Sequence, residues 1–225
     1  MYFHIAAGLM VIGFATFLAY FAVLIYSNSL IQNPDRNHFR NSFPYNFYSS
    51  FSIVNRVVLY VLLFAGTILT CIGESFFFIS FQTAFTFILG LLLPLSLLCL
   101  VVSNVMPMTF YKIHLITSGI GFTLFGFSLT AFAFARVIPS ALNLASDLSL
   151  FVAIVIGFIG IISIASLINP KLKSWSKMDK TEENGTTYYV KPKVNFYALY
   201  EWIFLVFMQL TNLILFLNIV ITGAF

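Results

Sequence analysis

The sequence predicts an all-α fold, a bundle of six membrane-spanning helices. Long apolar segments fill most of the 225 residues, and the composition is 60% hydrophobic and 8% charged, whereas soluble domains carry about 25% charged residues. A spanning helix needs about 20 mostly apolar residues, because lipid offers no partners for backbone polar groups and a helix satisfies them internally. A transmembrane β-barrel would show short alternating segments instead, so this pattern favours helices.

Six segments meet the length requirement, and together they form one integral membrane domain over residues 1–225. The expected spans are residues 5–26, 53–73, 76–102, 109–136, 148–168 and 196–222. The first is interpreted as a retained span, because no basic segment precedes it. Only Gly73, Glu74 and Ser75 separate the second and third spans. This spacing predicts a tight antiparallel hairpin with Glu74 at its solvated tip.

Loop one, residues 27–52, is rich in aromatic side chains set among arginines and asparagines. Its aromatic residues are Phe39, Phe43, Tyr45, Phe47, Tyr48 and Phe51. Two interpretations remain open. The loop is either a lipid-contacting interfacial segment, in which Arg36 and Arg40 meet lipid phosphates, or an ordinary loop whose aromatic rings pack under the helix bundle.

Loop five, residues 169–195, is polar and holds six lysines. Its turn-forming cluster, residues 182–185, predicts a mobile segment. The lysines either attract anionic lipid or simply retain the loop in the cytoplasm. Asn184-Gly185-Thr186 also matches the acceptor pattern for N-glycosylation. A glycan on Asn184 would place loop five in the lumen.

The basic residues predict the orientation of the chain. Of the eleven lysines and arginines, all except Arg136 lie in or beside the first, third and fifth loops. Short cytoplasmic loops retain Lys and Arg. We therefore expect both termini on the non-cytoplasmic side.

The fourth span carries small and polar residues on two opposed helical faces. One face holds His114, Ser118, Gly121 and Ser128, and the other holds Gly119, Thr123, Gly126 and Thr130. Small residues allow helix backbones to approach each other in lipid. These stripes predict that the fourth span is the central helix, with Phe132 facing lipid.

Polar residues within the spans indicate one candidate site. The fourth and sixth spans start from the same side of the membrane, so His114 and Glu201 should lie at similar depth. A charged acid below the headgroups is costly, and His114 or Lys112 could pair with Glu201. Asn212 shares a face with Glu201 and lies roughly 16 Å deeper. On the other membrane side, Glu74 and Arg136 could form an exposed ion pair.

No motif in the sequence points to a cofactor, a metal or nucleic acid. Cys71 and Cys99 both lie in apolar segments, where they are interpreted as small buried hydrophobes. No two histidines offer a zinc or haem arrangement, and no nucleophile elbow or phosphate-binding loop is present. In a multi-pass membrane protein the net charge of +4 reflects loop positions rather than nucleic-acid binding.

Three fragments resemble the DRAM-type family, the damage-regulated autophagy modulators and related six-span proteins. They are residues 102–136, with Lys112 and His114 heading a small-residue helix, the Glu201-Trp202 opening of the last span, and Phe43-Pro44-Tyr45. The resemblance covers about a third of the chain. The family's Ser-Asp after the aromatic-proline segment is absent here, and its usual orientation is opposite to that expected from the basic residues. The resemblance implies six helices and a lipid-linked or regulatory role.

The sequence therefore favours a membrane protein without a catalytic motif, acting through contacts with membrane lipids or with other membrane proteins. The first alternative is a small transporter or lipid-handling carrier that uses Glu201, Asn212 and His114 along an internal path. The second is a membrane-embedded, lipid-modifying enzyme with His114 and Glu201 as acid and base.

Overall fold

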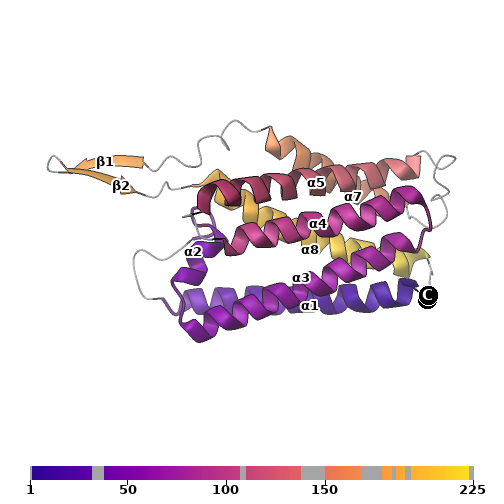
Figure 1. Cartoon of the computed structure of the whole chain (residues 1–225), viewed down its shortest axis with the longest axis horizontal. Coiled ribbons are helices and arrows are strands. Elements are labelled where there is room, and N and C mark those ends of the chain that lie inside the picture. The colour runs from indigo at the N-terminus through magenta and orange to yellow at the C-terminus, as the bar shows by residue number, and fades with distance from the viewer. Residues whose placement is uncertain are drawn as a thin grey trace.

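A computed structural model of the chain describes residues 2–31, 38–106, 110–137, 150–168, 179–183, 186–190 and 194–222. Its long helices lie side by side in one bundle (Figure 1). They are α1 (Tyr2–Ser29), α3 (Ile53–Ile79), α4 (Ala84–Val105), α5 (Tyr111–Val137), α7 (Leu150–Leu167) and α8 (Phe196–Thr222). All six are long and apolar enough to cross a membrane. The predicted all-α, six-span bundle is confirmed.

The helices follow one another around the bundle, and α8 lies between α7 and α1. Helix α1 packs on α3, α3 on α4, α4 on α5, and α5 on α7. Helix α8 contacts α1, α3, α4 and α7. It also meets α5, because the ring centroids of Phe204 on α8 and Phe122 on α5 are 4.2 Å apart. Helix α8 therefore touches all five other long helices, while α5 packs closely on α4 at Gly121 and on α7 at Gly126, the two close neighbours that its small-residue faces predict.

Glycines bring α1 and α3 together. A Cβ on Gly13 would lie 2.7 Å from the Thr70 hydroxyl, and one on Gly73 would lie 3.2 Å from the backbone nitrogen of Met10. Helix backbones approach this closely in lipid only where side chains are small. Gly73 thus serves helix packing and does not begin a turn.

The predicted hairpin at Gly73–Ser75 is wrong, because α3 continues to Ile79. The turn lies at residues 80–83, where Gln82 adopts a left-handed backbone with φ of 55°. Thr83 then caps α4: its hydroxyl accepts from the Thr86 N–H at 3.1 Å. Glu74 is consequently inside the bundle, only 3% exposed, and not at a solvated tip.

Helix α4 contains Pro94, which has no N–H to donate to the carbonyl of Gly90 one turn earlier. The Ser75 hydroxyl of α3 donates to that carbonyl instead, at 2.9 Å. A side chain of α3 thus satisfies the backbone group that the proline leaves unpaired, which ties the two helices together.

The C-terminal half of α5 packs closely on α7. A Cβ on Gly126 would lie 2.9 Å from Ile164, and one on Gly160 would lie 2.7 Å from the backbone nitrogen of Thr130. Gly119, in contrast, has open space beside it. Phe132 is completely buried and packs on Phe78 with ring centroids 5.0 Å apart, so the expectation that it faces lipid is wrong.

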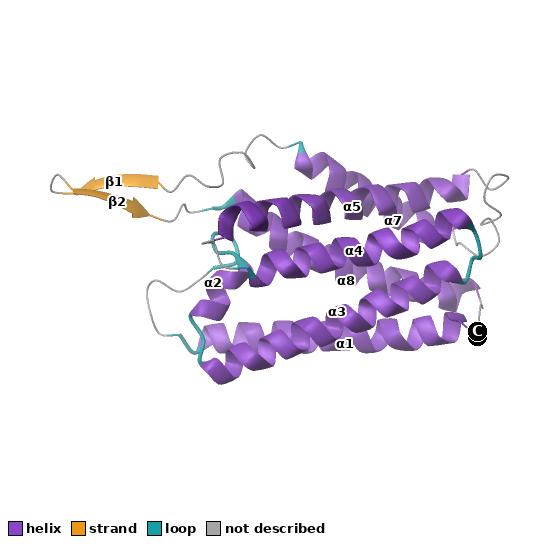
Figure 2. Cartoon of the chain, in the orientation of Figure 1, coloured by secondary structure: helices purple, strands orange, loops and turns teal. Residues whose placement is uncertain are grey.

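Two of the loops contain secondary structure that the sequence does not predict. Loop one holds the short helix α2 (Pro44–Ser49). Loop five holds an antiparallel hairpin of β1 (Asp179–Glu183) and β2 (Thr186–Val190), with Glu183 opposite Thr186. The hairpin extends beyond the end of the bundle (Figure 2). Glu182 and Glu183 therefore belong to β1, whereas Asn184 and Gly185 of the predicted turn-forming cluster lie outside the described residues.

Candidate functional site

The two ionisable side chains predicted to meet do so at the loop-one end of the bundle. His114 lies in the first turn of α5 and Glu201 in the second turn of α8. The His114 Nε2 is 2.8 Å from the Glu201 Oε1, which is within hydrogen-bonding distance. The two side chains are 0% and 1% exposed. The pair is therefore sealed from the surroundings.

The imidazole is enclosed by groups from several elements. The backbone carbonyls of Ser103 and Met106, at the C-terminal end of α4, approach it. The ring of Phe43 lies edge-on to it, with ring centroids 5.3 Å apart. Carbonyl oxygens are hydrogen-bond acceptors. The ring thus has acceptors from both α4 and α8 around it and an aromatic cover from loop one.

A second polar contact joins α5 and α8 beside the pair. The Ser118 hydroxyl donates to the carbonyl of His114 at 2.7 Å, and it also contacts the Tyr197 hydroxyl. Because the single Ser118 proton is used, the Tyr197 hydroxyl is the donor between them. The sequence carried a signal for this contact: Ser118 lies four residues after His114, and Tyr197 lies four before Glu201, so each pair shares a helix face.

Loop one closes the bundle over the pair. The Trp202 Nε1–H donates to the carbonyl of Ser42 at 2.9 Å, and the Tyr20 and Tyr48 hydroxyls are 2.5 Å apart. The N–H of Asn195 donates to the carbonyl of Arg40 at 2.8 Å. Phe43, Phe47, Tyr48 and Phe51 are all buried. These contacts agree with the interpretation that the loop-one aromatics pack under the bundle.

Tyr48 is a neutral group within this cover. Burial is the main cause that raises its pKa well above the usual value, and the neighbouring Tyr20 is the next. Glu201 adds a smaller electrostatic contribution in the same direction. The Tyr48 phenol therefore keeps its proton near neutral pH and stays able to donate a hydrogen bond to Tyr20.

The other predicted site residues do not join the pair. Lys112 is exposed at the start of α5. The Asn212 amide donates to the carbonyl of Met10 on α1 at 2.9 Å, so it joins α8 to α1. Arg40 is exposed beside α2. Arg36 and the side chain of Arg136 lie outside the described residues. The prediction of an exposed ion pair between Glu74 and Arg136 is wrong, because Glu74 is buried.

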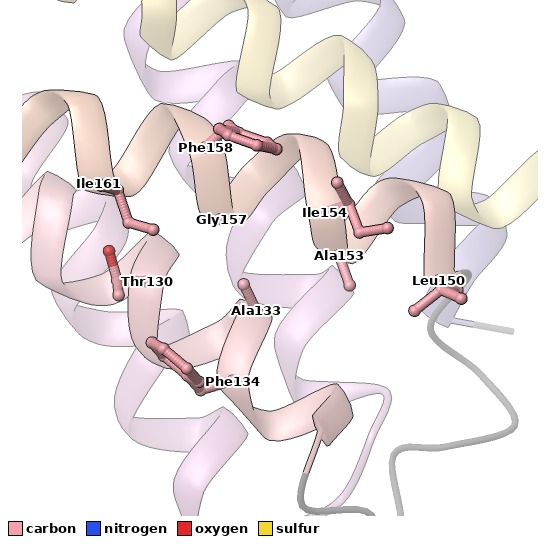
Figure 3. Close-up of a pocket in the computed structure, with 9 residues that line it drawn as sticks. All are labelled: Thr130, Ala133, Phe134, Leu150, Ala153, Ile154, Gly157, Phe158 and Ile161. Carbon is pink, nitrogen blue, oxygen red and sulfur yellow. The ribbon is translucent and has the colours of Figure 1, made fainter.

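An apolar groove on the outside of the bundle was not predicted. It lies between α5 and α7, has a volume of ≈ 240 Å³, and is shown in Figure 3. Its lining residues are Thr130, Ala133, Phe134, Leu150, Ala153, Ile154, Gly157, Phe158 and Ile161. Its one hydroxyl, on Thr130, donates to the carbonyl of Gly126 at 2.8 Å. The groove therefore offers only apolar contacts.

The fold and these contacts define an integral, multi-pass membrane protein. Comparisons with known proteins found no matching family model, no similar curated protein and no similar solved structure. Among the described residues, no three His, Cys, Asp or Glu side chains lie together as metal ligands would.

Proposed function

We propose that this chain acts without catalysis by binding lipid at its membrane-facing surface, and that the groove between α5 and α7 receives an acyl chain. The observation that carries this proposal is the character of the groove. Its lining is apolar, and its largest side chains are exposed on the outside of helices that are apolar enough to span a membrane. Acyl chains are the medium around such a surface.

The burial of the acid–imidazole pair supports a non-catalytic role. A catalytic acid and base must come within hydrogen-bonding reach of a substrate. His114 and Glu201 are both buried, and Phe43 covers the imidazole. A contact of this kind joins α5 to α8 as interhelical hydrogen bonds do in membranes.

The carrier alternative has no observation in its favour. It requires Glu201 and Asn212 to lie on one internal path, but the Asn212 amide is bonded to the backbone of α1. The resemblance to the DRAM-type family stays a prediction. It agrees with six helices and with a lipid-linked role.

Crosslinking with a photoactivatable phosphatidylcholine, whose acyl chain carries a diazirine, tests the acyl-chain proposal. Mass spectrometry should find crosslinks concentrated on residues that line the α5–α7 groove. Ala133→Phe fills the groove and should lower this crosslinking several-fold. Gly119→Phe is the matched control, because it adds the same side chain to α5 where space is open.

Crosslinks spread evenly over the lipid-facing surfaces, or equal crosslinking of both variants, would refute the groove as a lipid site. Thermal unfolding in detergent should first show that both variants fold as the parent protein does.

A further inference from the structure

A second apolar groove lies where α1, α8 and loop one meet. Its volume is ≈ 320 Å³, and its lining residues are Phe21, Phe39, Trp202, Ile203, Val206 and Phe207. All six are apolar or aromatic. The indole N–H of Trp202 is already bonded to the carbonyl of Ser42, so the lining offers no polar group that a ligand would need to satisfy.

The loop-one wall of this groove is held in place by aromatic packing. The ring of Phe39 lies edge-on to that of Trp202, with centroids 4.8 Å apart, and it stacks on Phe47 at 5.0 Å. Phe39 therefore links α8 to α2. The groove is a formed feature of the fold and does not depend on a free loop.

A cation lies next in the chain to the loop-one wall of the groove. Arg40 follows Phe39 directly in the chain, and its backbone carbonyl accepts from the N–H of Asn195 at 2.8 Å. Its side chain is exposed. The backbone of Arg40 is thus anchored against the start of α8, while the guanidinium is available to a ligand.

The depth of the groove relative to Arg40 matches the layout of a phospholipid. Trp202 lies six residues into α8, and Phe207 lies eleven residues into it. At 1.5 Å per residue the groove runs from about 9 to about 16 Å below the helix end. Arg40 lies above it, in loop one. This order, a cation at the end of the bundle and an apolar groove beneath it, follows the order of phosphate and acyl chain in a lipid.

We infer that this groove binds one glycerophospholipid, with its phosphate on the guanidinium of Arg40 and an acyl chain along Phe21, Val206 and Phe207. Arginine presents paired N–H donors that match the oxygens of a phosphate. The inference rests on the proposed function, because it also requires lipid binding. It adds a headgroup contact that the α5–α7 groove does not offer, because the one hydroxyl in that lining already donates to the carbonyl of Gly126.

The charge next to the groove favours a lipid over a second protein segment. An apolar helix would fill the groove without using the cation, whereas a phospholipid uses both. The same guanidinium chemistry would also bind free phosphate. Free phosphate, however, leaves the groove empty, and the two ligands can be separated by experiment.

Native mass spectrometry of the whole protein tests this site. The protein is delipidated in mild detergent and titrated with phosphatidylglycerol. Arg40→Gln should weaken binding of the first lipid about tenfold, which corresponds to about 1.4 kcal/mol. Val206→Trp, which fills the groove, should weaken it by at least as much. An excess of inorganic phosphate should not displace the lipid.

Two control variants should bind phosphatidylglycerol as the parent protein does. Lys112→Gln removes an exposed cation at the same end of the bundle, and Ile120→Trp adds an indole at similar depth on the exposed side of α5. Thermal unfolding should show that all four variants fold. Equal weakening by Arg40→Gln and Lys112→Gln would mean diffuse charge attraction and would overturn the site.

The remaining outcomes separate this site from the proposed function. Loss of binding in Val206→Trp with none in Arg40→Gln would overturn the headgroup contact. Unchanged binding in both variants would overturn the site as a whole. If crosslinking in the α5–α7 groove still falls in Ala133→Phe, the proposed function stands without this second site.

Discussion

At the scale of single residues, His114 and Glu201 form a buried contact between an imidazole and an acid. Taking an acid and an imidazole out of water is costly, and the contact offsets that cost only while both partners are present. Their distance of 2.8 Å and their near-complete burial mean that neither can find a replacement partner in water. Each side chain should therefore depend on the other.

A double-mutant cycle of His114→Ala and Glu201→Gln should reveal this dependence. We expect each single variant to lower the free energy of unfolding by about 1–3 kcal/mol, because each leaves a buried polar group without its partner. The double variant should lose less than the sum, with a coupling of at least about 0.5 kcal/mol. Reversible unfolding in mixed detergent micelles measures the free energy of unfolding of the parent protein, the two single variants and the double variant.

Lys112→Ala is the control for this cycle, because Lys112 is exposed and should not couple to Glu201. Strictly additive losses for His114 and Glu201 would contradict an energetic link between them.

At the scale of elements, small residues decide which helices approach each other closely. Helix α1 meets α3 at Gly13 and Gly73, and α5 meets α7 at Gly126 and Gly160. In lipid such packing drives association, because the helices gain little from the hydrophobic effect. Gly119, which has open space beside it, has no such role.

Gly126→Leu should therefore destabilise the bundle, whereas Gly119→Leu should not. A Cβ at Gly126 would be 2.9 Å from Ile164 and 3.3 Å from its backbone nitrogen, so the two helices would have to move apart. Overpacking of this kind costs about 1–3 kcal/mol. At Gly119 the same side chain enters open space. Thermal unfolding in detergent compares the two variants.

Equal losses of stability in these two variants would show that α5 meets a neighbour at Gly119, or that it does not pack on α7 at Gly126. Leu is added to the same helix in both variants, so helix propensity does not distinguish them.

At the scale of the whole molecule, the start of α1 and the end of α8 lie at the same end of the bundle (Figure 1). Loop one, the start of α5 and the β1–β2 hairpin all lie at the end that holds the His114–Glu201 pair. The distribution of Lys and Arg predicts that this end is cytoplasmic. Orientation thus determines which leaflet supplies the lipid proposed to bind at Arg40.

Cysteine labelling tests this orientation. With Cys71 and Cys99 changed to alanine, Ser176→Cys in loop five should not react with a membrane-impermeant maleimide in intact cells. Ser140→Cys, in the loop between α5 and α7, should react. The reverse pattern, or a glycan on Asn184, would invert the orientation.

Sequence alone determined the class of this protein and one of its contacts. Segments of about 20 apolar residues must be helical in lipid, and this requirement is local, so the six spans could be recognised without their neighbours. The meeting of His114 and Glu201 followed from a similar argument. Helices that start from the same membrane side hold residues of equal depth, and a buried acid seeks a partner.

Only the tertiary structure decided which face of each helix packs on a neighbour. A helix that is apolar on all sides shows no periodicity that separates its lipid-facing residues from its buried ones. For this reason Phe132 was expected outside and is buried, and Gly73 was expected in a turn but packs on Met10. The two grooves could not be predicted for the same reason, because each is lined by side chains from separate elements whose contact the sequence does not show.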